Sequence, residues 1–336
     1  MKRIRKLLLL TLVLTLFTCL DVRAEEIDGE LAENGISMIS QQGDITVYNT
    51  SEALKAERNE ETIPAGITKF EETDSVIGRD DRLKVTDTSK FPYCAIGLVE
   101  VIFIYSDNSV LEGTGTAWMI NEHMAITAAH MISSYDSNAQ KTVYASQIKF
   151  TPGYDGGVSP RRSYFANLVV YNPSYSSLLE ADGGILPVTT QKVSEDFALI
   201  GFKEDIGSKT GDFGALAMCS EYQNYFKPYT GISTAGYPGY VNNVENTNCY
   251  MYSVGGVIRE NHITYFTFSN DAGKGQSGSP LFLNNSGEYT YYSIGILSAG
   301  DENPNRKNFS YSIKPILLGN AKYWNDRYNR LGNIGG

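Results

Sequence analysis

The pattern of the chain after residue 75 most constrains its fold. Short runs of apolar and β-branched residues alternate with clusters of turn residues, which is typical of β-strands joined by tight turns. The clearest runs are 93–105, 117–120, 197–202 and 291–297, and the clearest turn clusters are Thr151–Gly157 and Gly236–Gly239. Near the end, Ile316, Leu317, Ala321 and Trp324 have helical spacing within 313–330. The pattern predicts an all-β fold followed by a C-terminal α-helix.

The first residues predict a secretory signal. Four basic residues within Met1–Lys6 precede the apolar run Leu7–Phe17, and Ala24 ends a suitable cleavage site, so we expect a signal peptide over residues 1–24. An anchor at Cys19, as in a lipoprotein, is the alternative. No later run approaches the roughly 20 apolar residues of a membrane span. We therefore expect a secreted, extracellular protein without stable membrane association.

Composition changes again at about residue 75. Residues 25–74 are acidic and poor in aromatic residues, and they are expected to form a propeptide. Residues 75–336 should form the functional domain, with a boundary between two halves at about 200–215. The chain's net charge of −10 argues against nucleic acid as a partner, because such binding needs a basic surface. We expect a monomer.

The cysteines are too few for a fold stabilised mainly by disulfides, and the histidines and cysteines do not form a recognisable metal site. Cys94, Cys219 and Cys249 remain after the expected signal cleavage, and a bridge between Cys219 and Cys249 is one of two alternatives. The three histidines show no spacing typical of metal ligands. No cofactor is expected.

A serine flanked by glycines is the sharpest local signal. Ser277 lies in Gly273–Phe282, where small neighbours expose its hydroxyl and glycine permits a tight turn. Such a turn can direct the N–H groups of Gly275 and Ser277 to one point, as an oxyanion hole requires. A simple Gly/Ser turn between strands is the alternative interpretation.

A serine nucleophile needs a base and a group that orients the base. His130 follows an apolar run that ends in two alanines, which leave room beside the imidazole. Asp196 precedes another apolar run, and its neighbour Glu195 should face the opposite side of the strand. We assign no chemical role to His123 or His262. The order His130, Asp196, Ser277 is one of three known orders of this triad.

Taken together, these passages resemble the bacterial glutamyl endopeptidases, a branch of the chymotrypsin-fold serine proteases. The resemblance is carried by Ser75–Arg82 with 91–93, by 116–120 with 127–130, by 194–202, by Gly275–Pro280 and, less strongly, by Gly236–Gly239. It implies two six-stranded antiparallel β-barrels, a triad of His130, Asp196 and Ser277, and a propeptide removed on maturation. Protein or peptide substrates and serine endopeptidase activity are the corresponding expectations. A catalytically silent binding protein or toxin on the same scaffold is the alternative.

The residues at the positions that would bind the substrate side chain differ from those expected in glutamyl endopeptidases. Glutamyl endopeptidases are expected to hold the substrate carboxylate with a histidine and a hydroxyl residue, where this chain has Leu297 and Ala272. Asp271 could instead favour Arg or Lys, or it could bind backbone groups. Three alternatives therefore remain open: cleavage after a basic residue, cleavage after Glu, and cleavage by an apolar or broad pocket.

Two further expectations complete the interpretation. The edge formed by Ser298 to Gly300 should pair with the substrate backbone as an added strand. Gln276 stands where animal trypsins carry an aspartate that captures the new amino terminus, which argues against that activation switch.

Overall fold

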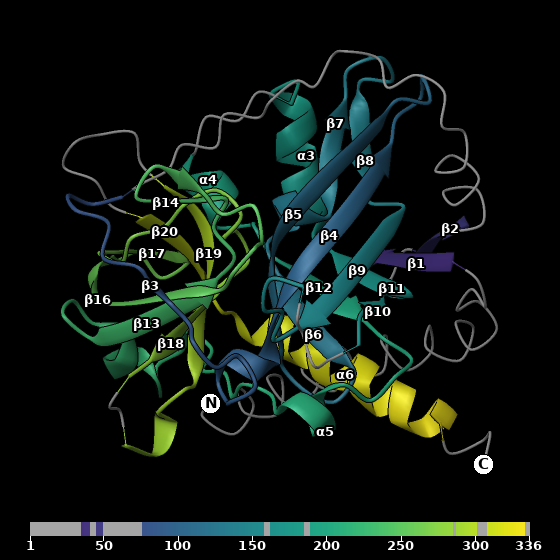
Figure 1. Cartoon of the computed structure of the whole chain (residues 1–336). Helices are drawn as coiled ribbons and strands as arrows, with labels where there is room; N and C mark the ends of the chain where they lie inside the picture. The colour runs from purple at the N-terminus through teal and green to yellow at the C-terminus, as the bar shows by residue number, and fades with distance from the viewer. Residues whose placement is uncertain are drawn as a thin grey trace, which may run out of the picture.

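Two β-sheets that lie side by side form the body of the protein (Figure 1). The computed structural model describes residues 76–157, 162–184, 189–284, 287–300 and 308–332, together with two strands at 35–40 and 45–49. The expected signal peptide lies outside the described residues. Most of the expected propeptide does too, but its strands β1 (Gly35–Ser40) and β2 (Ile45–Asn49) pair with each other, and β1 runs parallel to β11 (Leu168–Tyr171).

The first sheet is a curled half-barrel. In spatial order its strands are β10 (Tyr164–Phe165), β9 (Gln147–Pro152), β4 (Ile96–Ile104), β5 (Val110–Met119), β6 (Met124–Thr127), β12 (Ala198–Gly201), β11, β1 and β2. The chain bends directly from β10 into β11, where Ala166 N–H donates to Ile148 O and Asn167 N–H donates to Gly201 O. These bonds link the two sides of the curled sheet at the bend.

The second sheet closes into a barrel. Its order is β13 (Gly231–Gly236), β18 (Pro280–Leu283), β19 (Ser293–Gly300), β20 (Asn308–Ser312), β17 (Tyr265–Phe268) and β16 (Tyr252–Asn261), with β3 (Leu83–Lys84) on the edge. Pairing of β13 with β16 closes the six strands. The predicted all-β class is confirmed, and the chain passes between the sheets in the interval 201–231.

Shorter elements connect the strands. They comprise the hairpins β7 (Ser133–Asp136)–β8 (Lys141–Tyr144) and β14 (Tyr240–Val241)–β15 (Val244–Glu245), and the helices α3 (Pro173–Ala181), α4 (Thr190–Val193) and α5 (Gly207–Thr210). Helix α3 starts where the Asn172 side chain accepts the Ser174 N–H and Pro173 occupies the first helical turn. Single 3-10 turns span Tyr93–Ala95, Ala129–Met131, Gln223–Phe226 and Gly287–Tyr289.

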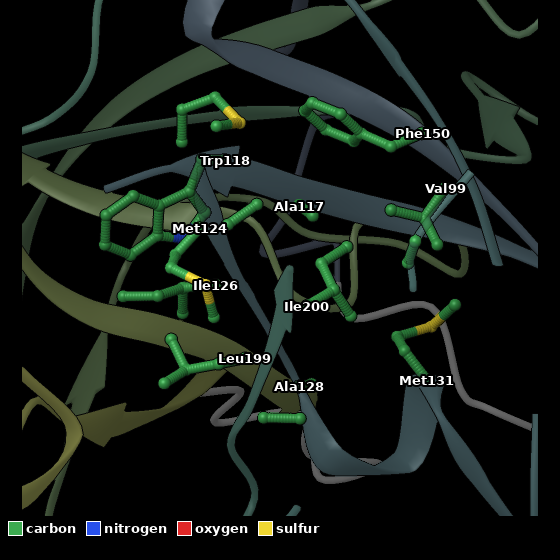
Figure 2. Packing of buried hydrophobic residues seen from close by; sticks show 14 of the residues in the cluster. Val99, Ala117, Trp118, Met124, Ile126, Ala128, Met131, Phe150, Leu199 and Ile200 are labelled. Carbon is green, nitrogen blue, oxygen red and sulfur yellow. The ribbon is translucent and has the colours of Figure 1, made fainter. Parts of the chain in front are cut away.

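The core of the first sheet supports the elements that carry His130 and Asp196. Every residue of β6 and β12 is buried, and Figure 2 shows Ile126, Leu199 and Ile200 of these strands among Trp118 and Met131. Burial of such side chains stabilises the fold by about 1.5–3 kcal/mol each. The ends of β6 and β12 are therefore held firmly.

Helix α6 (Pro315–Gly332) confirms the predicted C-terminal helix and runs beneath the first sheet (Figure 1). Its buried residues Leu317, Ala321, Trp324 and Tyr328 recur every three to four positions. The Tyr328 hydroxyl donates to the Asn167 side-chain oxygen over 2.8 Å. In the described part of the chain, no helix is long and apolar enough to cross a membrane.

The bridge between Cys219 and Cys249 is not formed. Both residues are free thiols in the structure. Cys249 packs against the large core cluster that extends from the first sheet onto strands of the second, whereas Cys219 starts a turn that leads to Tyr222, a residue packed on the separate core cluster of the second barrel. Because the two thiols belong to different environments, the alternative without a bridge is the correct one.

Candidate active site

His130 and Asp196 meet at the end of the first sheet. His130 lies in the 3-10 turn Ala129–Met131 that directly follows β6, and Asp196 lies just before β12, the neighbour of β6. The Asp196 carboxylate accepts from the His130 backbone N–H at 3.0 Å and bonds to its Nδ1 at 2.7 Å. An Nδ1–H that donates to this carboxylate leaves the lone pair of neutral histidine on Nε2, which can then accept a proton.

A second group, which the sequence had suggested only for backbone pairing, also holds Asp196. The Ser298 hydroxyl, from β19 of the other sheet, donates to Asp196 Oδ2 at 2.5 Å. Asp196 is 2% exposed, and these donors provide hydrogen-bond partners for its buried oxygens. Nothing in the local sequence signals this bond, because it joins residues 102 positions apart.

Ser277 lies in the turn between β17 and β18, and this turn packs on the strands that lead to His130. Thr116 N–H of β5 donates to Ser277 O over 2.9 Å. A Cβ on Gly278 would lie 2.1 Å from Thr116 O and 3.2 Å from Ala128 N, so the backbones touch there. The structure thus places the glycine-flanked serine turn against residue 128, two positions before His130.

The glycines of this turn adopt conformations that other residues avoid. Gly275 has φ +90° and Gly278 has φ +85°. The Gly275 carbonyl accepts from the Thr116 hydroxyl at 3.0 Å. Within the residues that the structure describes, neither the Gly275 N–H nor the Ser277 N–H donates a hydrogen bond. Both donors remain available to an incoming oxygen.

The Asp271 carboxylate accepts hydrogen bonds from the protein backbone. Its two carboxylate oxygens accept from Ile77 N–H at 2.6 Å and from Asp81 N–H at 3.0 Å. Burial, together with the nearby Asp81 carboxylate, raises the pKa of Asp271 to about 6 against the opposing effect of these two bonds. The side chain therefore anchors the segment that follows residue 75, one of the alternatives left open by the sequence.

Ala272 and Leu297 lie together in the apolar core of the second barrel. Both are 3% exposed and belong to the same cluster as Ile294 and Phe266. The structure thus brings together the two positions that depart from the glutamyl endopeptidase pattern. Neither side chain can donate a hydrogen bond.

Among the described residues, Ser298 to Gly300 are paired with a strand on one edge only. Ala299 and Gly300 pair with Phe309 and Asn308 of β20 on one side. The pairing of β19 with β18 on the other side ends at Ile296. In the part of the chain that the structure describes, no strand pairs with the edge beside Asp196.

The remaining histidines serve packing. His123 Nδ1 lies 3.1 Å from Phe202 O, and its ring stacks on Tyr328 of α6. His262 stacks on Tyr265 at the surface. Among the described residues, no group of three His, Cys, Asp or Glu side chains could hold a metal ion.

Comparison with known sequences identifies relatives that match most of the chain. The sequence model of the family described as Trypsin matches residues 101–316. A glutamyl endopeptidase of Bacillus licheniformis is 28% identical over 256 residues, which cover 76% of this chain and 64% of that protein. The chain therefore spans less than two thirds of this relative's length. A Bacillus subtilis protein named extracellular metalloprotease is 23% identical over 88% of both chains.

Solved structures share the fold. A Glu endopeptidase, solved in complex with MPD, superposes with a TM-score of 0.55 at 20% identity and covers 74% of this chain and 98% of its own. Protease Anisep of Arthrobacter nicotinovorans gives 0.52 at 15% identity, covering 71% and 96%. At these identities the likeness concerns the fold, and it confirms the chymotrypsin-like architecture.

Proposed function

The chain belongs to the trypsin family, and from this premise we propose that it is a secreted serine endopeptidase in which His130, Asp196 and Ser277 act as one catalytic unit. The observation that carries the proposal is the His130–Asp196 hydrogen bond at 2.7 Å, formed where the Ser277 turn packs beside residue 128. A buried carboxylate that orients an imidazole beside a glycine-flanked serine has the arrangement required for acyl transfer.

In the proposed reaction, the Ser277 hydroxyl oxygen attacks the carbonyl carbon of a peptide bond. His130 Nε2 takes the hydroxyl proton and then gives it to the departing amine, which leaves an ester on Ser277. Water attacks this ester with His130 again as the base, His130 gives the proton to the Ser277 oxygen as its bond to the acyl carbon breaks, and the carboxylic acid product leaves. Asp196 keeps its negative charge throughout and stabilises the protonated imidazole.

The carbonyl oxygen becomes negatively charged in this reaction and needs donors. The available N–H groups of Gly275 and Ser277 are the proposed oxyanion hole. The open edge from Ser298 to Gly300 is proposed to bind the substrate backbone as an added β-strand. Binding there would place the peptide beside the catalytic unit.

For the residue on the acyl side of the cut, an uncharged side chain fits the surroundings best. A glutamate carboxylate against Ala272 and Leu297 would be buried without donors from their side chains, at a cost of several kcal/mol. Asp271, which could pair with Arg or Lys, already binds two backbone N–H groups. Para-nitroanilides ending in Phe, Glu and Arg distinguish the three alternatives. Fastest cleavage after Phe is expected, and fastest cleavage after Glu or Arg would overturn this preference.

The proposed maturation removes residues 1–24 during export and residues 25–74 afterwards. The B. subtilis relative is described as extracellular. The protein that acts on substrates would then begin near Ser75, just before the segment that binds Asp271.

Covalent labelling tests the catalytic assignment. A fluorophosphonate should label the mature protein at Ser277, and Ser277→Ala should abolish both labelling and peptide cleavage. Ser279→Ala is the matched control, because it removes a buried hydroxyl from the same turn and leaves the nucleophile in place. Labelling that persists in Ser277→Ala would show that the nucleophile is misassigned.

Two other activities predict different results in this assay. A silent binding protein would show neither labelling nor cleavage. A metal-dependent peptidase, as the name of the B. subtilis relative suggests, would lose cleavage with 1,10-phenanthroline and resist the fluorophosphonate.

A further inference from the structure

A buried arginine next to the edge strand of the second sheet contacts the turn that carries Ser277. Arg82 is 4% exposed and lies directly before β3. Its Nε and Nη2 donate to Asp80 Oδ1 and Oδ2 at 2.9 and 2.7 Å, a bidentate ion pair. Burial alone would raise the pKa of Asp80, but the bonds from Arg82 and from Asn242 N–H outweigh it and lower the pKa. The pair is therefore charged in the buried site.

The same guanidinium joins two further parts of the chain. Its Nη2 also donates to Tyr240 O in the β14–β15 hairpin at 2.9 Å, and its Nη1 donates to Gln276 Oε1 at 2.8 Å. Arg82 has only donors, so the Gln276 oxygen must be the atom that faces it. The planar arrangement of the guanidinium thus fixes the direction of a side chain that belongs to the serine turn.

Gln276 stands between the two residues proposed to form the oxyanion hole. It is fully buried, its N–H donates to Gly273 O at 2.9 Å, and its carbonyl accepts from Ser279 N–H at 3.0 Å. The flanking Gly275 has a positive φ, a conformation that glycine enters and leaves with little restraint. A side-chain bond from a rigid partner therefore adds a restraint on this turn to those made by its backbone hydrogen bonds.

Arg82 is itself fixed by the segment before it. The Ile77 and Asp81 N–H groups bind Asp271, and the Asp80 carboxylate accepts from Asn242 N–H at 2.8 Å. Docking of residues 77–82 thus brings the guanidinium to Gln276.

We infer that Arg82 is a positioning residue for the oxyanion hole: through Gln276 it holds the Gly275 and Ser277 N–H groups in the direction that binds the charged oxygen. The inference rests on the proposed serine endopeptidase function. A merely structural role would lower stability alone, whereas a positioning role lowers the rate of the chemical step in protein that is fully folded.

The test compares Arg82→Met and Gln276→Leu with Arg79→Met, using the mature enzyme and the para-nitroanilide that it cleaves fastest. Arg79 belongs to the same segment and carries the same charge, but it is exposed. Arg82→Met should lower kcat about ten- to hundredfold with little change in KM, and it should weaken binding of the matching peptide aldehyde by a similar factor. Arg79→Met should change neither.

Gln276→Leu keeps the Arg82–Asp80 pair and tests the link separately, so the inference remains testable if Arg82→Met does not fold. Gln276→Glu retains an acceptor oxygen and should lose less kcat than Gln276→Leu. The double variant Arg82→Met/Gln276→Leu should be scarcely slower than the slower single variant, because each substitution removes the same hydrogen bond between Arg82 and Gln276.

Two results would contradict the inference in different ways. If both Arg82→Met and Gln276→Leu melt at lower temperature but keep the kcat of the folded enzyme, Arg82 has only a structural role and the proposed function stands. If the wild-type protein neither cleaves the para-nitroanilides nor reacts with a fluorophosphonate, the proposed function itself fails, and the inference fails with it.

Discussion

Gly278→Ala tests the close contact that brings the serine turn to the strand before His130. Gly278 has φ +85°, and a Cβ there would lie 2.1 Å from Thr116 O and 2.4 Å from the Thr127 hydroxyl. A strained backbone of this kind is destabilising by about 1–3 kcal/mol. Forcing an extra group into a packed site adds about 1–3 kcal/mol. We expect a loss of about 2–6 kcal/mol in the free energy of unfolding.

Gly183→Ala separates the two contributions. Gly183 also has a positive φ, +62°, but among the described atoms none lies within 4 Å of its would-be Cβ. Both substitutions reduce the entropy of the unfolded chain equally, so this effect cancels between them. The excess loss in Gly278→Ala, about 1–3 kcal/mol, measures the contact with Thr116 and Thr127.

Urea unfolding gives the two free energies, and the rate of fluorophosphonate labelling reports on Ser277 in the folded protein. Thermal midpoints should differ by about 2–4 °C for each kcal/mol. Labelling should slow in Gly278→Ala because the adjacent Ser277 must move. Equal stability of the two variants, with normal labelling of both, would refute the close approach of the turn to β5 and β6.

Three other variants test individual hydrogen-bonded side chains, and one sequencing experiment tests the proposed maturation. Asp196→Asn should leave substrate KM largely unchanged and lower kcat by about four orders of magnitude, because the amide favours the wrong tautomer of His130; steady-state kinetics would reveal a smaller effect if Asp196 were not the orienting group. Ser298→Ala removes one hydrogen bond to the same carboxylate and should lower kcat about tenfold, and an unchanged kcat would mean that the backbone and imidazole donors suffice. The pKa of Asp271 is raised to about 6, so the stability linked to its protonated form is complete below its unfolded pKa near 4 and is lost as the pH rises through about 6. In thermal melts the Asp271→Asn variant should therefore gain stability relative to the wild type as the pH rises from about 4 to 6, and a constant difference would contradict the raised pKa. Amino-terminal sequencing of the active secreted protein should begin near Ser75, and a start near Glu25 would exclude a removed propeptide.

Local sequence was sufficient wherever the signal was itself local. The apolar runs predicted the buried strands β6 and β12 because strand residues with both faces covered must be apolar. The helical spacing of Leu317, Ala321 and Trp324 predicted α6 for the same reason. His130 and Asp196 could be proposed because each adjoins one of those buried strands, and neighbouring strands bring their ends together.

The part of the site that depends on distant contacts was not predictable. The sequence could suggest that Asp271 binds backbone groups, but its partners Ile77 and Asp81 lie about 190 positions earlier in the chain. The Ser298 bond to Asp196 and the Arg82 bond to Gln276 likewise join residues that are far apart in the sequence. Periodicity reports which residues are buried and gives no information about which buried polar groups face one another.

The sequence by itself therefore determined the β class of the fold and the glycine turn, since each depends on the conformational preferences of adjacent residues, and it was the basis for proposing His130, Asp196 and Ser277. Only the tertiary structure decided that Cys219 and Cys249 stay apart, that Asp271 anchors the segment after residue 75 and that Arg82 reaches the serine turn. Buried polar groups must find partners wherever the packed barrels place them, and a partner's position along the chain leaves no trace in the local pattern.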